Sequence, residues 1–217
     1  MVSPATRRIV ATREAAFILG SACLRQPAAL GIAQVSYPDW PPMPTPHSPD
    51  DLIAKLDELG IKTERIDHVA VFTVAESKEL RGKVPGHHTK NLFLKDKKGR
   101  IFLVSALEST RIDLKRLHER LGASGRLSFG SAELLMEKLG VMPGSVTAFA
   151  VVNDHAGDVT MVLDAALMDG ERLNFHPLVN TATLGISRDD MLAFLRAVGH
   201  EPMIIDLPTP PDDGQNG

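Results

Sequence analysis

The chain has 217 residues, of which 43% are hydrophobic and 24% charged, and its mean hydropathy is near zero. This composition is that of an ordinary soluble globular protein, and the absence of any run of about 18 apolar residues excludes a membrane-spanning helix. A single cysteine, Cys23, excludes an internal disulfide framework and fits a reducing compartment, so we expect a cytoplasmic protein.

The net charge of −3 hides a basic segment. Residues 81–126 contain 12 basic and 4 acidic residues, a net charge of +8, so the rest of the chain carries −11. A basic block in an acidic chain suggests contact with a polyanion. Hairpin and helix surfaces that face water have the same composition, and charge alone favours this second interpretation.

Residues 1–47 are predicted to be an extension outside the folded domain. The first 35 residues contain four arginines and a single acid, Glu14, and residues 38–46 are rich in proline. A transit peptide, an over-long start and a flexible tail all fit this composition. At the other end, residues 207–217 are rich in Pro, Asp and Gly and are predicted to be disordered. The folded domain is therefore expected to span residues 48–206.

The first part of this domain is predicted to hold one helix and three strands. Ser48 is a good N-cap, Pro49 fits the first helical position, and Gly60 ends the helix. Residues 96–99, Asp-Lys-Lys-Gly, form a hairpin signal between two apolar runs. The predicted strands are residues 66–74, 91–94 and 100–104.

The second part begins with two helices, residues 113–121 and 131–139, each followed by a glycine. The elements predicted after a Met-Pro-Gly turn are strands 146–152, 159–167 and 172–175 and a helix from Ser187 to Gly199. Strands and helices are intermixed, and the hairpins exclude an all-parallel sheet. The predicted fold class is α+β: a single domain with a mixed, mostly antiparallel β-sheet or barrel core and surrounding helices.

Familiar catalytic motifs are absent from the sequence. It contains eight histidines, but no HExxH pattern and no Cys/His spacing typical of a metal site. It also lacks a GxSxG elbow, a Walker loop and a GxGxxG motif. We therefore expect no metal and no cofactor.

Three polar points beside apolar strands remain as candidate site residues. Lys90 and Asn91 directly precede the run Leu-Phe-Leu, Pro177 holds His176 extended at a strand end, and Gly144 opens a tight turn. Each has an ordinary explanation: a surface lysine, a hydrogen-bonded rim histidine and a turn glycine. Together they supply a cation, an amide, an imidazole and backbone N–H groups, with no nucleophile. This set favours binding an anionic, ester-bearing ligand and positioning a water molecule.

Four segments resemble the YbaK/prolyl-tRNA-synthetase-associated domain family. They are residues 86–94 (GHHTKNLFL), 96–103 (DKKGRIFL), 139–149 (LGVMPGSVTAF) and 174–183 (NFHPLVNTAT). The resemblance runs from about residue 48 to residue 206. One departure concerns the substrate loop, which usually reads GSVTP in the family: Ala148 stands where proline is expected, and this bears on the stiffness of the loop.

The resemblance implies a YbaK-like fold and a trans-editing activity, the hydrolysis of alanine mischarged on tRNA(Pro). Lys90 and Asn91 would hold the 3′-terminal adenosine and its phosphate, and His176 would orient the aminoacyl end. Gly144 and its loop would contact the aminoacyl group and the attacking water through backbone groups, while a ribose hydroxyl of the substrate assists that water. Further substrate contacts are expected from Ser145, Asn174 and Asn180.

The expected partner is the acceptor end of tRNA(Pro), and the basic segment 81–126 then becomes a candidate surface for the acceptor stem. Prolyl-tRNA synthetase is a second candidate partner, no membrane contact is expected, and both a monomer and a weak dimer remain open. Two alternatives also remain: a Cys-tRNA deacylase of the same family, and a module that binds tRNA or a synthetase without catalysis.

Overall fold

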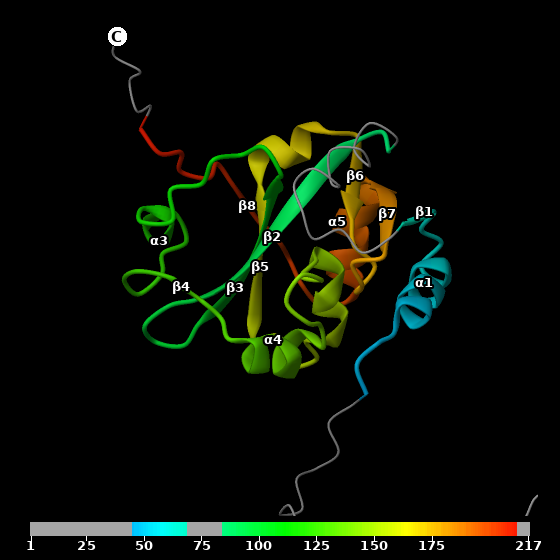
Figure 1. Cartoon of the computed structure of the whole chain (residues 1–217), viewed down its shortest axis with the longest axis horizontal. Helices are drawn as coiled ribbons and strands as arrows, with labels where there is room; N and C mark the ends of the chain where they lie inside the picture. Colours follow the sequence, from blue (N-terminus) through cyan, green and yellow to red (C-terminus); the bar gives the residue numbers. More distant parts are fainter. Residues whose placement is uncertain (1–44, 69–83, 212–217) are drawn as a thin grey trace, which may run out of the picture. The chain divides into compact units, whose positions relative to one another are not determined.

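A computed structural model of the chain describes residues 45–68 and 84–211. In these residues, strands form one mixed sheet in the order β1-β7-β6-β2-β3-β5-β8, with β4 paired to β2 (Figure 1). The strands are β1 (Glu64–Asp67), β2 (His87–Lys95), β3 (Ile101–Leu107), β4 (Ser128–Phe129), β5 (Val159–Asp164), β6 (Arg172–Phe175), β7 (Ala182–Ser187) and β8 (Met203–Ile205). Four of the seven neighbouring pairs are antiparallel and three are parallel, which confirms the predicted α+β domain with a mixed, mostly antiparallel sheet.

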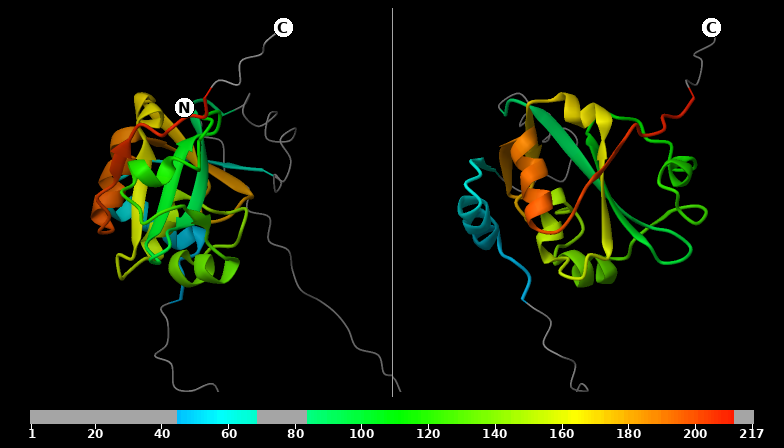
Figure 2. Two further views of the ribbon diagram at one scale, coloured as in Figure 1. Left: turned by 90° about the vertical axis from the view of Figure 1, so that its left-hand side faces the viewer. Right: turned by 180° about the vertical axis from the view of Figure 1, so that it is seen from behind.

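Helices pack against this sheet, and their ends follow the capping signals in the sequence. The helices are α1 (Pro49–Glu58), α3 (Leu117–Arg120), α4 (Ala132–Leu139) and α5 (Arg188–Ala197), with 3-10 helices η1 (Ala148–Asn153) and η2 (Ala165–Asp169). At the start of α1, Ser48 Oγ accepts from Asp51 N at 3.2 Å, and the Asp51 carboxylate accepts from Ser48 N at 2.9 Å. Figure 2 shows α5 on the back of β6 and β7. None of the described helices is long and apolar enough to cross a membrane.

Alternate residues of the β2–β3 hairpin face two different hydrophobic clusters. Phe93 and Leu103 belong to a first cluster, with residues from α1, α4, η1 and α5. Leu94 and Phe102 belong to a second cluster, with residues from α3. Lys90, Leu92 and Leu94 lie on the same side of β2, the side that faces the second cluster. Because apolar side chains cover both sides, the hairpin is held as a rigid central element.

The strand predicted over residues 146–152 is wrong, because Ala148–Asn153 form the 3-10 helix η1. Residues 148–152 are all buried, and a continuous apolar run does not distinguish a buried strand from a buried helical segment. Thr147 supplies the local cause. It lies in an extended conformation as the N-cap of η1, and its Oγ1 accepts from Phe149 N at 3.4 Å.

Other boundaries also differ from the prediction. The strand predicted over residues 159–167 ends at Asp164, where η2 begins, and the helix predicted over 113–121 is reduced to the single turn α3. The strands β4, β7 and β8 were not predicted. Of the strand predicted over residues 66–74, the part from residue 69 lies outside the described residues.

The ends of the described chain contact the domain. His47 N donates to Asn153 Oδ1 at 2.8 Å. Near the other end, Leu207 is 7% exposed within the second cluster, and Asp113 N donates to Pro208 O at 2.7 Å. The expected boundaries at residues 47 and 206 therefore fall beside residues that pack on the domain, while residues 1–44 and 212–217 lie outside the described part.

Candidate functional site

Lys90 heads a chain of polar contacts that crosses the sheet. It lies opposite Ala106 on β3, and its Nζ donates to the backbone carbonyl of Thr110. The Thr110 hydroxyl donates in turn to Asp164 Oδ2 at 3.0 Å, at the end of β5. Asp164 is only 3% exposed. The ammonium group is therefore held in place by a buried carboxylate that acts through Thr110.

Partial burial changes the electrostatic environment of the Lys90 ammonium group. Burial lowers the pKa of its ammonium below the usual 10.5, and the nearby carboxylates of Glu108 and Asp164 oppose this shift. A partly desolvated cation interacts more strongly with an anion than one in bulk water does, because fewer water molecules screen the pair. Lys90 is therefore suited to hold a phosphate rather than only to solubilise a strand end.

Asn91 points to the opposite side of β2 from Lys90, because side chains alternate along a strand. It lies opposite Ser105, and the fully buried Ser105 hydroxyl donates to Asn91 Oδ1 at 2.5 Å. Phe93, on the same side, belongs to the first cluster. The structure therefore does not bring the side chains of Lys90 and Asn91 together, and the visible contact of Asn91 is one that joins β2 to β3.

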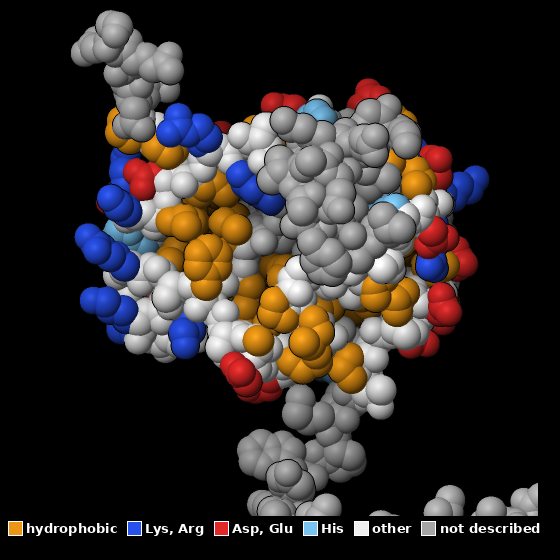
Figure 3. Space-filling view, viewed as in Figure 1, with side chains coloured by type: hydrophobic (Ala, Val, Ile, Leu, Met, Phe, Trp, Pro, Cys, Tyr) orange, Lys and Arg blue, Asp and Glu red, His pale blue; other side chains and the backbone are white. Residues whose placement is uncertain are grey.

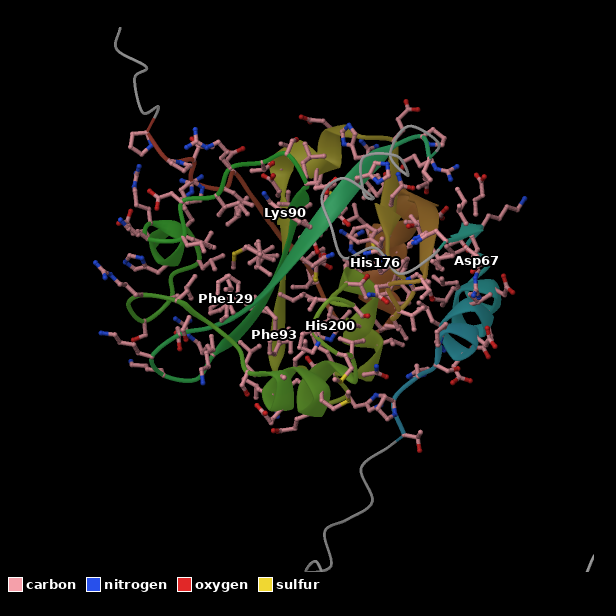
Figure 4. All side chains as sticks on the ribbon, in the orientation of Figure 1. Asp67, Lys90, Phe93, Phe129, His176 and His200 are labelled. Atoms are coloured by element: carbon pink, nitrogen blue, oxygen red, sulfur yellow. The ribbon has the colours of Figure 1, made fainter. Side chains whose placement is uncertain are left out.

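His176 follows β6 and is oriented by a backbone bond. Its Nδ1 lies 3.1 Å from the carbonyl oxygen of Ala182. A carbonyl can only accept, so Nδ1 carries the proton and Nε2 of the neutral ring remains an acceptor. The ring centroid of His68 lies 6.4 Å away, and His68 Nε2 is 3.0 Å from Thr183 Oγ1. Figure 4 shows His176 beside β6 and Lys90 on β2.

Burial lowers the pKa of His176 below its usual 6.5, and the neighbouring His68 adds to this shift. The bond to the Ala182 carbonyl acts in the other direction but is the smaller influence. His176 is therefore neutral at pH 7, when Nε2 can accept a hydrogen bond from a water molecule or from an ammonium group.

Gly144 and Asn180 lie next to each other although they are far apart in the chain. Gly144 has φ +92°, a left-handed conformation that favours glycine, and a Cβ added there would lie 3.9 Å from Asn180 Nδ2. Ser145, 9% exposed, donates its N–H to Met142 O at 3.0 Å, which closes the turn. On the Asn180 side, Leu178 also has a positive φ, +64°, and is held there by burial in the first cluster.

Asn174 ties β6 to the start of β2. Its Nδ2 donates to Pro85 O at 3.0 Å, and its backbone carbonyl accepts from the Thr89 hydroxyl at 2.8 Å. The side chain is 3% exposed, and its Oδ1 has no hydrogen-bond partner. The parallel register pairs Asn174 with His88, so Asn174 lies on the same side of the sheet as Lys90.

The polar groups at these positions suit ligand binding more than nucleophilic attack. They comprise a cation at Lys90, an imidazole acceptor at His176 and a buried acceptor at Asn174. In the part of the chain that the structure describes, no three His, Cys, Asp or Glu side chains gather in a group that could hold a metal ion.

The residues that support Lys90 were not among the predicted site residues. Asp164 carries a sequence signal, since an acid that ends an apolar run is buried only when it has a partner. Thr110 carries none, because its contact with Asp164 depends on the parallel pairing of β3 with β5.

Comparison with known proteins identifies a family to which the chain is similar. The profile of the aminoacyl-tRNA editing domain matches residues 68–194, which include all seven candidate residues. Over 161 residues the chain is 41% identical to prolyl-tRNA synthetase associated domain-containing protein 1 of Mus musculus, a match that covers 72% of this chain and 95% of that protein. Over 157 residues it is 37% identical to the prolyl-tRNA editing protein ProX of Acetoanaerobium sticklandii, with 72% and 95% covered.

Among solved structures, one assigned as a trans-editing enzyme for prolyl tRNA synthetase matches with a TM-score of 0.58 at 19% identity. The match covers 76% of this chain and 99% of that one. At this identity the likeness concerns the fold.

Proposed function

The chain belongs to the aminoacyl-tRNA editing domain family and is an aminoacyl-tRNA deacylase, and we propose that its substrate is alanine mischarged on tRNA(Pro). The observation that carries the proposal is the partly buried Lys90 at the head of the contacts to Thr110 and Asp164, on the same side of the sheet as Asn174. The relative that edits prolyl-tRNA supports the choice of tRNA. The reaction would take place in the cytoplasm, with prolyl-tRNA synthetase as a further partner.

Lys90 would bind the phosphate of the terminal adenosine. Its ammonium donates to the Thr110 carbonyl, which is a neutral acceptor. A phosphate is a stronger acceptor for an ammonium group, because both partners are charged. Asp164 would keep Thr110 in position while Lys90 turns to the phosphate. Asn91 would act from the other side of β2, by fixing the strand against Ser105.

The hydrolysis itself requires positioning and stabilisation of charge. Water attacks the ester carbonyl, a tetrahedral oxyanion forms, and its collapse releases alanine and the ribose hydroxyl. His176 Nε2 would accept a hydrogen bond from the aminoacyl ammonium group or from the water. The N–H of Ser145 is used by the turn, so the N–H of Gly144 would be the loop donor that faces the oxyanion. An aminoacyl ester is reactive, so this set of groups is sufficient.

Discrimination between alanine and proline would depend on size. A synthetase pocket built for proline rejects the smaller alanine weakly, because each missing methylene is worth only about 1–3 kcal/mol. An editing site that admits alanine and excludes proline corrects this error as a second sieve. The loop from Gly144 to Ala148 would form its wall, with Asn180 beside it.

The test is a deacylation assay with tRNA(Pro) charged with alanine, cysteine or proline. We expect the alanyl ester to be hydrolysed much faster than the prolyl ester, and Lys90→Ala to lower the rate at least about tenfold through lost phosphate binding. The exposed Lys62 provides the matched control, since Lys62→Ala should leave the rate unchanged. Equal hydrolysis of the alanyl and prolyl esters would refute the assignment, and faster hydrolysis of the cysteinyl ester would identify a Cys-tRNA deacylase.

A further inference from the structure

Phe129 is an aromatic side chain that the fold leaves in solvent. It is 60% exposed, the highest value for a large hydrophobic residue in the part of the chain described here. It belongs to the two-residue strand β4, and Figure 4 shows it to one side of β2. Most large apolar side chains of the domain pack in the two clusters, and Phe129 belongs to neither.

The backbone around Phe129 is fixed although its ring is exposed. β4 pairs with β2, with Phe129 opposite Leu94, and Gly130 N donates to Phe93 O at 2.9 Å. Gly130 has no room for a side chain, because a Cβ there would lie 2.4 Å from the Phe93 ring. The ring is therefore presented by a rigid backbone, which lowers the entropy cost of contacting a ligand.

The segment that leads into β4 is also held, by Asp96 in the β2–β3 turn. Asp96 Oδ2 accepts from Ser124 N at 2.9 Å and from Arg100 Nε at 2.9 Å. The bonds from Ser124 and Arg100, together with that from Lys98 N, lower the pKa of Asp96 to about 2, so the carboxylate stays charged at any pH of interest. Both ends of the segment that carries Phe129 are thus tied to the hairpin.

Phe129 lies on the same face of β2 as Lys90. Directly opposed residues in an antiparallel pair share a face, so Phe129 shares the face of Leu94, and Leu94 shares that of Lys90. Leu94 lies four residue steps along the strand from Lys90, a distance of about 13 Å. Figure 3 shows hydrophobic side chains on this side of the molecule, with Lys and Arg along the adjacent edge. An apolar contact and a cation for phosphate therefore follow one strand.

The surroundings of Phe129 are basic. The side chain of Lys97 packs on Gly125, with 3.3 Å from its Cδ to the Cβ that a residue there would have. Arg126 is exposed in the same segment. Neither Lys97 nor Arg126 has an ion-pair partner among the described residues. An exposed aromatic ring with unpaired cations around it fits an unpaired nucleotide better than an apolar protein surface.

We propose that Phe129 stacks on the base of one of the two nucleotides that precede the terminal adenosine of the tRNA. This inference rests on the proposed function, since it requires the ester-bearing adenosine at Lys90. The 3′ end of a tRNA is single-stranded, and exposed aromatic rings bind unpaired bases by stacking. The separation of about 13 Å along β2 corresponds to one or two nucleotides of extended strand. Phe129 would then be a positioning residue that sets the register of the tRNA end.

The first experiment measures binding and needs no hydrolysis. Uncharged tRNA(Pro) carrying 2-aminopurine at the first or the second nucleotide before the terminal adenosine is titrated with the full-length protein. We expect a change in emission at one of these positions with wild type and with Phe129→Trp, and none with Phe129→Ala. Ile204→Ala, an exposed apolar residue on β8, is the matched control and should behave as wild type.

The second experiment measures hydrolysis of two substrates. With Ala-tRNA(Pro), Phe129→Ala should raise KM about tenfold and leave kcat unchanged, because stacking is the same in the ground and transition states. With alanyl-adenosine, which lacks the preceding nucleotides, the variant should equal wild type. Equal loss on both substrates, or an emission change that survives in Phe129→Ala, would overturn the proposal. So would a Phe129-dependent dimer in sedimentation, which would assign this face to a second copy of the chain. If wild type shows the emission change but does not hydrolyse Ala-tRNA(Pro), the proposed substrate is wrong and the stacking contact stands.

Discussion

The two ring nitrogens of His176 have different roles, because the Ala182 carbonyl fixes the proton on Nδ1. Nε2 is then the ring atom left as an acceptor, and it accepts a hydrogen bond only while the ring is neutral. Lys90 is a donor instead: its ammonium group donates to the Thr110 carbonyl, and burial lowers its pKa. One residue of the site therefore supplies a cation and the other an acceptor, and pH affects them in opposite ways.

The acid side of the pH–rate profile should report His176. Its pKa lies below 6.5, so we expect deacylation to be insensitive to this group at pH 7 and to fall about tenfold per pH unit once the pH is below that pKa. His176→Gln should remove this fall in rate at low pH. The matched control is His155→Gln, at an exposed histidine, which should keep it. The measurement is kcat/KM between pH 4.5 and 8, corrected for hydrolysis without enzyme. If the fall in rate at low pH persisted unchanged in His176→Gln, it would have to come from the titration of another group.

The same shift affects stability with a defined sign. The unfolded chain has a histidine pKa near 6.5 and the native state a lower one, so between these values the unfolded state binds more protons. The contribution of His176 therefore makes the native state less stable as the pH falls through this window, and it has no effect on stability above it.

At the scale of elements, the 3-10 helix η1 explains the departure at Ala148. Thr147 is the N-cap of η1 and Ala148 is its first residue. The first helical position is the one that tolerates proline best, because its N–H has no partner within the helix and its φ suits the ring. The proline expected in the family's loop thus corresponds to a helix start, within the stretch 146–152 that the apolar pattern predicts to be a strand.

Replacing Ala148 by proline is expected to stabilise the protein. Ala148→Pro should raise the free energy of unfolding by about 0.4–1 kcal/mol, because it restricts the unfolded chain at a position compatible with proline. Chemical denaturation measures this, and the ratio of alanyl to prolyl ester hydrolysis should rise if the loop becomes stiffer. Ala150→Pro is the control: it removes the bond from Ala150 N to Thr147 O and should destabilise. Similar destabilisation by both variants would show that the buried site at 148 cannot hold the ring.

Some helices could be predicted from capping residues in the sequence, whereas some strands have no such local signal. α1, α4 and α5 begin at Ser48, Ser131 and Ser187, whose side chains each accept from a backbone N–H three residues on. β7 and β8 carry no comparable signal, because β7 follows the site loop directly and β8 is a three-residue edge strand. Their existence depends on partners that are distant in the sequence.

The candidate site was predictable to a similar degree. Lys90, Gly144 and His176 were identified from residue types at strand ends and from the resemblance. That Asn91 faces away from Lys90 follows from the alternation of a strand, which the interpretation of the two as one contact overlooked. The support of Lys90 by Asp164 could not be predicted, because it depends on which strands are neighbours and in what register.

Across the whole domain, charge is distributed unevenly. Within the basic segment, described residues 84–126 carry 10 basic and 4 acidic side chains, whereas residues 49–67 carry 6 acidic and 3 basic ones. Figure 3 shows Lys and Arg gathered along the edge near α3 and a group of Asp and Glu along the edge near α1. Such a field would orient a polyanion toward the basic edge before contact. The same edge adjoins the face of β2 that carries Lys90 and Phe129.

tRNA binding should therefore weaken steeply with salt, and the basic edge should account for part of the slope. Each phosphate contact releases about 0.7–0.9 counterion, so charge reversal at Lys97 and Lys98 should reduce the slope of log K against log salt by about 1 or more. Both side chains are exposed in the β2–β3 turn and neither belongs to the catalytic site. The matched control is charge reversal at Lys55 and Lys62, near α1, which changes the net charge equally. Binding is measured with uncharged tRNA(Pro) from 50 to 300 mM salt. A slope unchanged in the first variant, or reduced equally in both, would place the tRNA on another surface, because only direct phosphate contacts change the number of counterions released.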